Sequence, residues 1–226
     1  MNYRITGTGS CIPDITKKNS DFLENKFLDT DGGKFQTSNS EIIDKFNSIT
    51  GIYERRYAPD EINCSDLAAV AAGLAINDSK LDQETLDYII VAHNTGDISC
   101  SSGQVDTLPS IASRVKAKLK IKNPNCVAYD IICGCPGWVE GIIQAKSFIK
   151  SGMAKKCLVI ACDTLSRILD ENDRDSMIYA DGSGAIVLES DSSYDGGILS
   201  HKSATFTYEG ENDYIFYGSS YDTNKR

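Results

Sequence analysis

The segment YDIICGCPGW, residues 129–138, contains the residues best suited to chemistry, because two cysteines one residue apart directly precede a proline. Three interpretations are open. Cys133 and Cys135 are packed structural thiols, they form a Cys-x-Cys pair for metal or redox work, or Cys135 is a nucleophile at the start of a helix. A metal site needs further ligands, and the two histidines of the chain, His93 and His201, are not at ligand spacing. A disulfide within the pair would close a small, strained ring, so the packed thiol and the nucleophile remain.

The sequence next to Cys135 is compatible with a nucleophile. Pro136 suits the first position of a helix, since proline lacks an N–H that would be unpaired there and has a preset φ. Cys135 would then lie at or beside the N-cap, where the positive end of the helix dipole stabilises a thiolate. Gly134 and Gly137 flank the thiol with minimal side chains, so a substrate can approach closely.

Apolar runs and helical patterns predict the elements that would position this turn. Short aliphatic runs predict strands at 3–7, 88–93, 126–131, 157–163 and 185–189. Longer segments predict helices at about 67–76, 108–119 and 136–150, the first of them beginning near Ser65 and Asp66. The helix after Cys135 is apolar nearly all round, so we expect it to be buried. The alternation predicts an α/β fold, a layered βαβαβαββ arrangement with a mixed, mostly parallel sheet.

Composition limits the classes of function. A chain of 226 residues that is 41% hydrophobic can form a globular core, and its net charge of -9 argues against nucleic-acid binding. The sequence shows no apolar stretch of signal-peptide or membrane-span length, which predicts a cytoplasmic protein that does not enter a membrane. Most of the eight cysteines should be reduced, and Cys126, Cys157 and Cys162, within apolar runs, should behave as small hydrophobic residues. No metal or cofactor is predicted.

The string DIICGCPGW resembles the active-site segment of the β-ketoacyl-acyl carrier protein synthase III family, condensing enzymes of the thiolase fold. In that family an aspartate stands five residues before the nucleophilic cysteine, and a small residue and an aromatic follow it. These positions are Asp130, Cys135, Gly137 and Trp138 here. Three other segments resemble family signatures in the expected order: YRITGTGSCIPD at 3–14, TGIYERRYA at 50–58 and YADGSGAIVLES at 179–190. The resemblance covers nearly the whole chain.

The resemblance implies an acyl transfer followed by a condensation. Cys135 would accept an acyl group from a thioester, with its own backbone N–H helping to stabilise the oxyanion. Decarboxylative Claisen condensation with a malonyl thioester would then give a β-ketoacyl thioester, in fatty acid or related polyketide synthesis. Gly137, Trp138 and Leu108 are the expected substrate-binding residues, with Leu108 at the place of an aromatic on a loop that crosses the dimer interface of related enzymes. The implied partners are acyl carrier protein, acyl and malonyl thioesters and, in a homodimer, a second copy of the chain.

The resemblance is to one half of such an enzyme. Residues 1–190 match the N-terminal half, and residues 191–226 are expected to form a connecting strand and loop. Family members draw a catalytic histidine and asparagine from a second half, and neither His93 nor His201 matches that histidine motif. We therefore expect the 226-residue chain alone not to complete the condensation.

A second departure concerns the donor. Lys45 and Ile49 stand where the resemblance places a tryptophan and an arginine that contact coenzyme A. This favours a carrier-protein donor over coenzyme A. The alternatives to a fatty acid enzyme are a specialised condensing enzyme for a secondary lipid or polyketide, and an incomplete module that binds an acyl group without condensing it.

Overall fold

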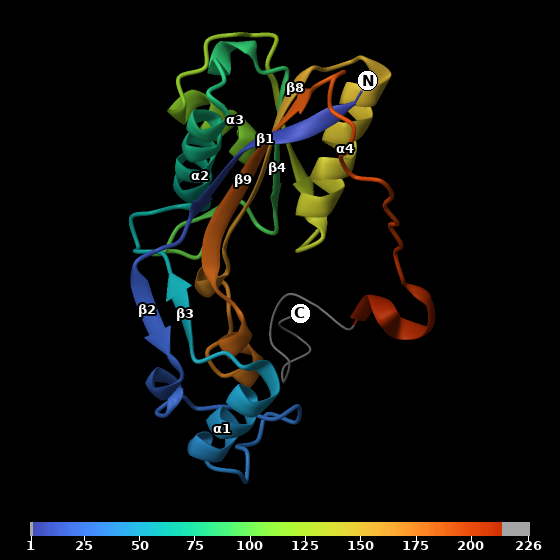
Figure 1. Ribbon diagram of the computed structural model, residues 1–226. Coiled ribbons are helices and arrows are strands. Elements are labelled where there is room, and N and C mark those ends of the chain that lie inside the picture. Colours follow the sequence, from blue (N-terminus) through green and yellow to red (C-terminus); the bar gives the residue numbers. More distant parts are fainter. Residues whose placement is uncertain (1, 214–226) are drawn as a thin grey trace. The chain divides into compact units, whose positions relative to one another are not determined.

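A five-stranded sheet organises the part of the chain that carries Cys135 (Figure 1). The computed structural model describes residues 2–213, which divide into two units. The first comprises 2–15, 57–164 and 181–201, and the second comprises 16–56, 165–180 and 202–213. The strands of the first unit are β1 (Tyr3–Cys11), β4 (Tyr88–His93), β7 (Val127–Ile132), β8 (Lys156–Thr164) and β9 (Asp181–Ser190), with a small hairpin of β5 (Asp97–Ile98) and β6 (Val105–Asp106). Its helices are α2 (Cys64–Ser79), α3 (Ile111–Lys118) and α4 (Gly137–Ser151), with a 3-10 turn at η2 (Gln83–Thr85).

The sheet has the strand order β1-β9-β8-β4-β7. Along the chain its elements run β1, α2, β4, α3, β7, α4, β8, β9, which confirms the predicted βαβαβαββ arrangement. β4 is parallel to both β7 and β8, whereas β9 is antiparallel to β8 and to β1. The sheet is therefore mixed, with as many antiparallel as parallel pairings, because β9 runs back between β8 and β1.

Helices cover both faces of this sheet (Figure 1). α2 and α3 pack on one face, where the alanines of α2 allow a close approach: a Cβ added at Gly9 of β1 would lie 2.2 Å from the carbonyl oxygen of Ala71. α4 packs on the other face through one side that includes Ile142 and Ile149. Val139, on the far side of α4, is 51% exposed, so the prediction of a helix buried nearly all round was wrong. An outer-layer helix has only one face to bury.

Polar side chains set the starts of two helices. α2 begins at Cys64, next to the predicted start at Ser65, where Asn63 is the N-cap and donates its N–H to the carboxylate of Asp66 at 2.9 Å. α3 begins at Ile111 rather than near residue 108, since the hydroxyl of the N-cap Ser110 accepts the N–H of the residue three positions later.

The second unit has a small core of its own, for which the sequence analysis predicted no elements. It contains α1 (Asn39–Thr50) and most of the paired strands β2 (Ile15–Lys18) and β3 (Glu54–Tyr57). It also contains 3-10 turns at η1 (Asn19–Phe22), η3 (Leu165–Arg167), η4 (Arg174–Ile178) and η5 (Tyr208–Asp213). Phe22, Phe27, Ile42, Ile43 and Met177 form the core. The strand expected after residue 190 is not found in 191–213, and the rest of that prediction lies outside the described residues.

Candidate active site at the carboxyl edge of the parallel strands

Three parallel strands end at one edge of the sheet, and the predicted nucleophile follows one of them. In the register of β4 with its neighbours, His93 pairs with Ile132 and Ala92 pairs with Ala161. The segments after β4, β7 and β8 therefore meet at this edge. Ligands of open α/β sheets commonly bind outside the carboxyl ends of the strands, so this edge is the candidate site.

Cys135 lies in a tight turn between β7 and α4. Gly134 has a φ of 65°, which glycine adopts without strain, and its carbonyl accepts the N–H of Gly137 at 2.9 Å. Pro136 is the N-cap rather than the first helical position predicted for it, and the side chain of Cys135 is exposed. Among residues 2–213, no hydrogen bond engages the backbone N–H of Cys135. An exposed thiol therefore lies beside an available N–H donor.

Close packing of the α4 start against β4 holds this turn in place. Gly137 is buried, and a Cβ added there would lie 3.1 Å from the Cβ of Ala92 and 3.5 Å from that of Cys133. Trp138 is half-buried against the core under α4, and its indole N–H has no hydrogen-bond partner in the described part of the chain. The small size of Gly137 thus serves helix packing, and substrate contact by these two residues stays a prediction.

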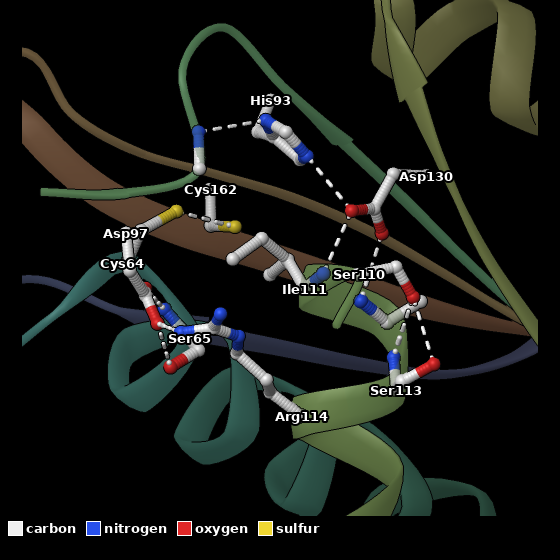
Figure 2. Close-up of polar contacts among 12 residues, drawn as sticks. Cys64, Ser65, His93, Asp97, Ser110, Ile111, Ser113, Arg114, Asp130 and Cys162 are labelled. Atoms are coloured by element: carbon white, nitrogen blue, oxygen red, sulfur yellow. Dashed lines mark hydrogen bonds and ion pairs between the residues drawn. The ribbon is translucent and has the colours of Figure 1, made fainter. Parts of the chain in front are cut away.

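Asp130, five residues before Cys135, binds three N–H donors (Figure 2). Its carboxylate accepts the backbone N–H groups of Ile111 and Ala112 at 2.7 and 2.8 Å, which caps α3. It also lies 3.0 Å from Nε2 of the buried His93. Because the Gly96 N–H donates to Nδ1 of His93 at 3.0 Å, the proton of the neutral ring is on Nε2 and is donated to Asp130. Both ring nitrogens of His93 are therefore occupied.

A second pair, which the sequence analysis missed, lies closer to the turn. Asn94 follows β4 and donates its backbone N–H at 2.9 Å and its side-chain N–H at 2.6 Å to the two carboxylate oxygens of Asp163. A Cβ added at Gly134 would lie 3.7 Å from the side-chain amide oxygen of Asn94. Burial raises the pKa of Asp163, and the hydrogen bonds from Asn94 oppose that rise. The signal in the sequence was a polar residue at the end of two predicted strands: Asn94 directly after one and Asp163 as the last residue of the other.

A polar network extends from this edge over the starts of α2 and α3. Asp97 accepts the backbone N–H of Ser65 at 2.7 Å and its hydroxyl at 2.8 Å, and it pairs with Arg114 at 2.9 Å (Figure 2). Arg114 also pairs with Asp106, and that hydrogen bond lowers the pKa of Asp106. A cavity of about 330 Å³ lies beside these groups, lined also by Asn63 and the polar side chains of the β5–β6 hairpin. Arg114 pairs with both carboxylates and so connects α3 to the two strands of the β5–β6 hairpin.

The structure does not bring the other sequence-predicted residues into this cluster. Leu108 is 83% exposed, on the loop before α3. His201 is exposed and irregular in conformation, with Nδ1 3.5 Å from Nζ of Lys146. Lys45 and Ile49 lie one helical turn apart on α1, in the second unit, and both are exposed. The described residues hold no group of three or more potential metal ligands, and none of their helices is long and apolar enough to cross a membrane.

The sequence of this chain is similar to those of known proteins. The model of the 3-oxoacyl-[acyl-carrier-protein (ACP)] synthase III family matches residues 129–206. A beta-ketoacyl-[acyl-carrier-protein] synthase III of Neisseria gonorrhoeae is 40% identical over 83% of this chain and 52% of its own length. One from Ehrlichia ruminantium is 36% identical over 87% of this chain and 55% of its own length.

The fold is also similar to those of solved synthase III structures. A 3-oxoacyl-[acyl-carrier-protein] synthase III from Aquifex aeolicus has a TM-score of 0.67 and 33% identity, over 84% of this chain and 55% of that one. A synthase III from Pseudomonas aeruginosa has a TM-score of 0.69 and 28% identity, over 88% of this chain and 54% of that one. The chain thus spans about half the length of the relatives it matches.

Proposed function

We infer that this chain, which belongs to the 3-oxoacyl-[acyl-carrier-protein] synthase III family, provides the acyl-accepting half of a condensing enzyme in fatty acid or related polyketide synthesis. One observation carries the inference: the exposed Cys135 thiol and its available N–H lie together at the start of α4. This arrangement supports nucleophilic catalysis by a thiol with an oxyanion donor next to it.

In the acyl transfer, the thiolate of Cys135 attacks the carbonyl carbon of an acyl thioester. A new carbon–sulfur bond forms, and the carbonyl oxygen becomes an oxyanion that accepts the N–H of Cys135. Collapse of this intermediate breaks the bond to the donor sulfur, which leaves as a thiolate and takes up a proton. Pro136 lacks an N–H, but the donor that the oxyanion needs belongs to the preceding residue. The chain then carries the acyl group on Cys135.

The condensation with a malonyl thioester requires groups that stabilise an enolate, and we assign them to neither histidine. His93 is buried, with Nε2 and Nδ1 both hydrogen-bonded. His201 is exposed beside Lys146 and does not approach Cys135 through any contact among the described residues. These placements favour uncoupling in this chain, where Cys135 is acylated and malonyl thioester is not consumed.

Donor choice and assembly are further parts of the proposal. Lys45 and Ile49 form an exposed pair on α1 that offers neither an aromatic ring nor a guanidinium, which favours acyl carrier protein over coenzyme A as the donor. Leu108 is an exposed apolar side chain of the kind that contacts a second copy of the chain in a homodimer. We place this homodimer in the cytoplasm.

The test is to incubate the purified chain with matched acyl thioesters of acyl carrier protein and of coenzyme A, each with and without malonyl thioester. We expect an acyl adduct on Cys135, formed faster from the carrier protein, and no release of carbon dioxide. A faster reaction with coenzyme A would contradict the donor assignment. Turnover of malonyl thioester would mean that a group of this chain stabilises the enolate, and no adduct from either donor would refute the proposed function.

A further inference from the structure

Two buried thiols meet beside the candidate site. Cys64 is the first residue of α2 and Cys162 lies near the end of β8, 98 positions further along the chain. Their sulfur atoms face one another 2.9 Å apart (Figure 2). The side chains are 0% and 2% exposed. The sequence predicted that Cys162 acts as a small hydrophobic residue, and contact with a second thiol gives it a chemistry that a lone buried cysteine lacks.

We propose that Cys64 and Cys162 form a reversible disulfide when the protein meets a low-molecular-weight disulfide oxidant. A disulfide needs a sulfur–sulfur distance of about 2.05 Å, so the two atoms have to approach by less than about 1 Å. Because the fold already holds them side by side, the second bond-forming step is intramolecular and strongly favoured over reaction with solvent thiols. The bond would fasten the start of α2 to a central strand of the sheet.

The oxidation balances with one molecule of glutathione disulfide. One protein thiolate attacks a sulfur of glutathione disulfide, forms a mixed disulfide and releases one glutathione thiolate. The second protein thiolate then attacks the protein sulfur of the mixed disulfide and releases the other glutathione. The two protein thiols lose their S–H protons, and these protons convert the two glutathione thiolates to thiols. The protein sulfurs are oxidised by two electrons, and the glutathione sulfurs are reduced by two.

The surroundings make this reaction slow at neutral pH. The hydrogen bond between the thiols raises the pKa of Cys64 and lowers that of Cys162, whereas burial raises both, and both pKa values lie above the ordinary range. The carboxylates of Asp97 and Asp163 raise both pKa values further, and Asp130 adds to this for Cys162. Since the thiolate is the reacting form, the rate of oxidation should rise about tenfold per pH unit between pH 7 and 9.

The experiment uses the full chain with serine at the three exposed cysteines, so that they form no adducts. The replacements are Cys100→Ser, Cys133→Ser and Cys135→Ser. This protein is incubated with excess glutathione disulfide, denatured without reductant, alkylated and mapped by mass spectrometry. We expect two fewer alkylated cysteines, a mass lower by about 2 Da before alkylation, and a cross-linked peptide pair containing Cys64 and Cys162. Dithiothreitol should restore both thiols.

Thermal unfolding gives a second measurement. Closing so long a loop should raise the melting midpoint of the oxidised protein by about 5–10 °C. Adding Cys64→Ala or Cys162→Ala should abolish the cross-link, whereas Cys157→Ala, at a buried position of the same strand, should retain it. The proposal is overturned by an unchanged alkylation count, by glutathione adducts alone, or by a cross-link between other cysteines. None of these outcomes depends on acyl transfer, so the proposed function stands or falls separately.

Discussion

The carboxylate of Asp130 should contribute strongly to stability, and Asp130→Asn tests this with almost no change of shape. The carboxylate accepts three N–H donors, from His93, Ile111 and Ala112. Asparagine keeps one oxygen and turns an NH₂ group toward a donor, so at least one charge-assisted hydrogen bond is lost and one part-buried donor loses its partner. The favourable charge at the start of α3 is lost as well. Together these losses amount to about 3 kcal/mol of the free energy of unfolding.

Urea denaturation followed by circular dichroism measures this loss. With a slope of about 2 kcal/mol per molar, the midpoint should fall by about 1.5 M. Asp106→Asn is the matched control, since Asp106 is a half-exposed carboxylate paired with Arg114, and its midpoint should stay close to that of the parent protein. If Asp130→Asn lowers the midpoint no more than Asp106→Asn, Asp130 does not anchor β4, β7 and α3 as described.

Three further predictions follow from the same contacts. Because the pKa of Asp163 is raised on folding, the parent should lose stability relative to Asp163→Asn as pH rises from about 4, measured by urea denaturation across pH. Gly9→Ala should destabilise the fold by about 3 kcal/mol or more, since its Cβ would meet the α2 backbone, whereas Gly184→Ala, with open space around its Cβ, should be tolerated in the same assay. Brief iodoacetamide treatment should label Cys135 faster than Cys133, which is also exposed, because Cys135 directly precedes the N-cap of α4 in the chain.

Other results would contradict these arguments in turn. A parent that gains stability relative to Asp163→Asn as pH rises would contradict the assigned direction of the pKa shift. Equal midpoints for Gly9→Ala and Gly184→Ala would mean that α2 does not lie on the backbone of β1. Faster labelling of Cys133 would remove the helix dipole as the source of reactivity at Cys135.

The main sheet was predictable because its strands are short, aliphatic and buried. The strand at 88–93 has the predicted bounds, and the ends of the other four strands lie within a few residues of the predicted ends. The start of α3 was less predictable, because it depends on which polar side chain caps the helix, as Ser110 shows. The order and direction of the strands could not be predicted from the sequence, because β9 lies between β1 and β8 and so pairs with residues far away in the chain.

The second unit was missed because its core is small and comes from distant segments. Met177 packs with Phe22 and Ile43, and no periodicity within one segment signals such a core. A local signal for α1 was present in Ser38 and Glu41, a capping box just before apolar residues.

The site was predictable at Cys135 and less so around it. The proline and glycines next to the thiol indicated the turn, and the turn is found where they stand. The partners of Asp130 could not be read from the sequence, because His93 and the start of α3 reach it only through the parallel pairing of β4 and β7. The same holds for Asn94 and Asp163, which lie on different segments and meet only at the sheet edge.

The central claim is that Cys135 accepts an acyl group, and intact-mass measurement after incubation with an acyl thioester tests it most directly. The parent chain and Cys133→Ala should each gain the mass of one acyl group, mapped to Cys135 by peptide analysis and removed by hydroxylamine. Cys135→Ala should gain none. An acyl group that persists in Cys135→Ala, or one that is lost in Cys133→Ala while Cys135 stays unmodified, would show that another residue is the acyl acceptor.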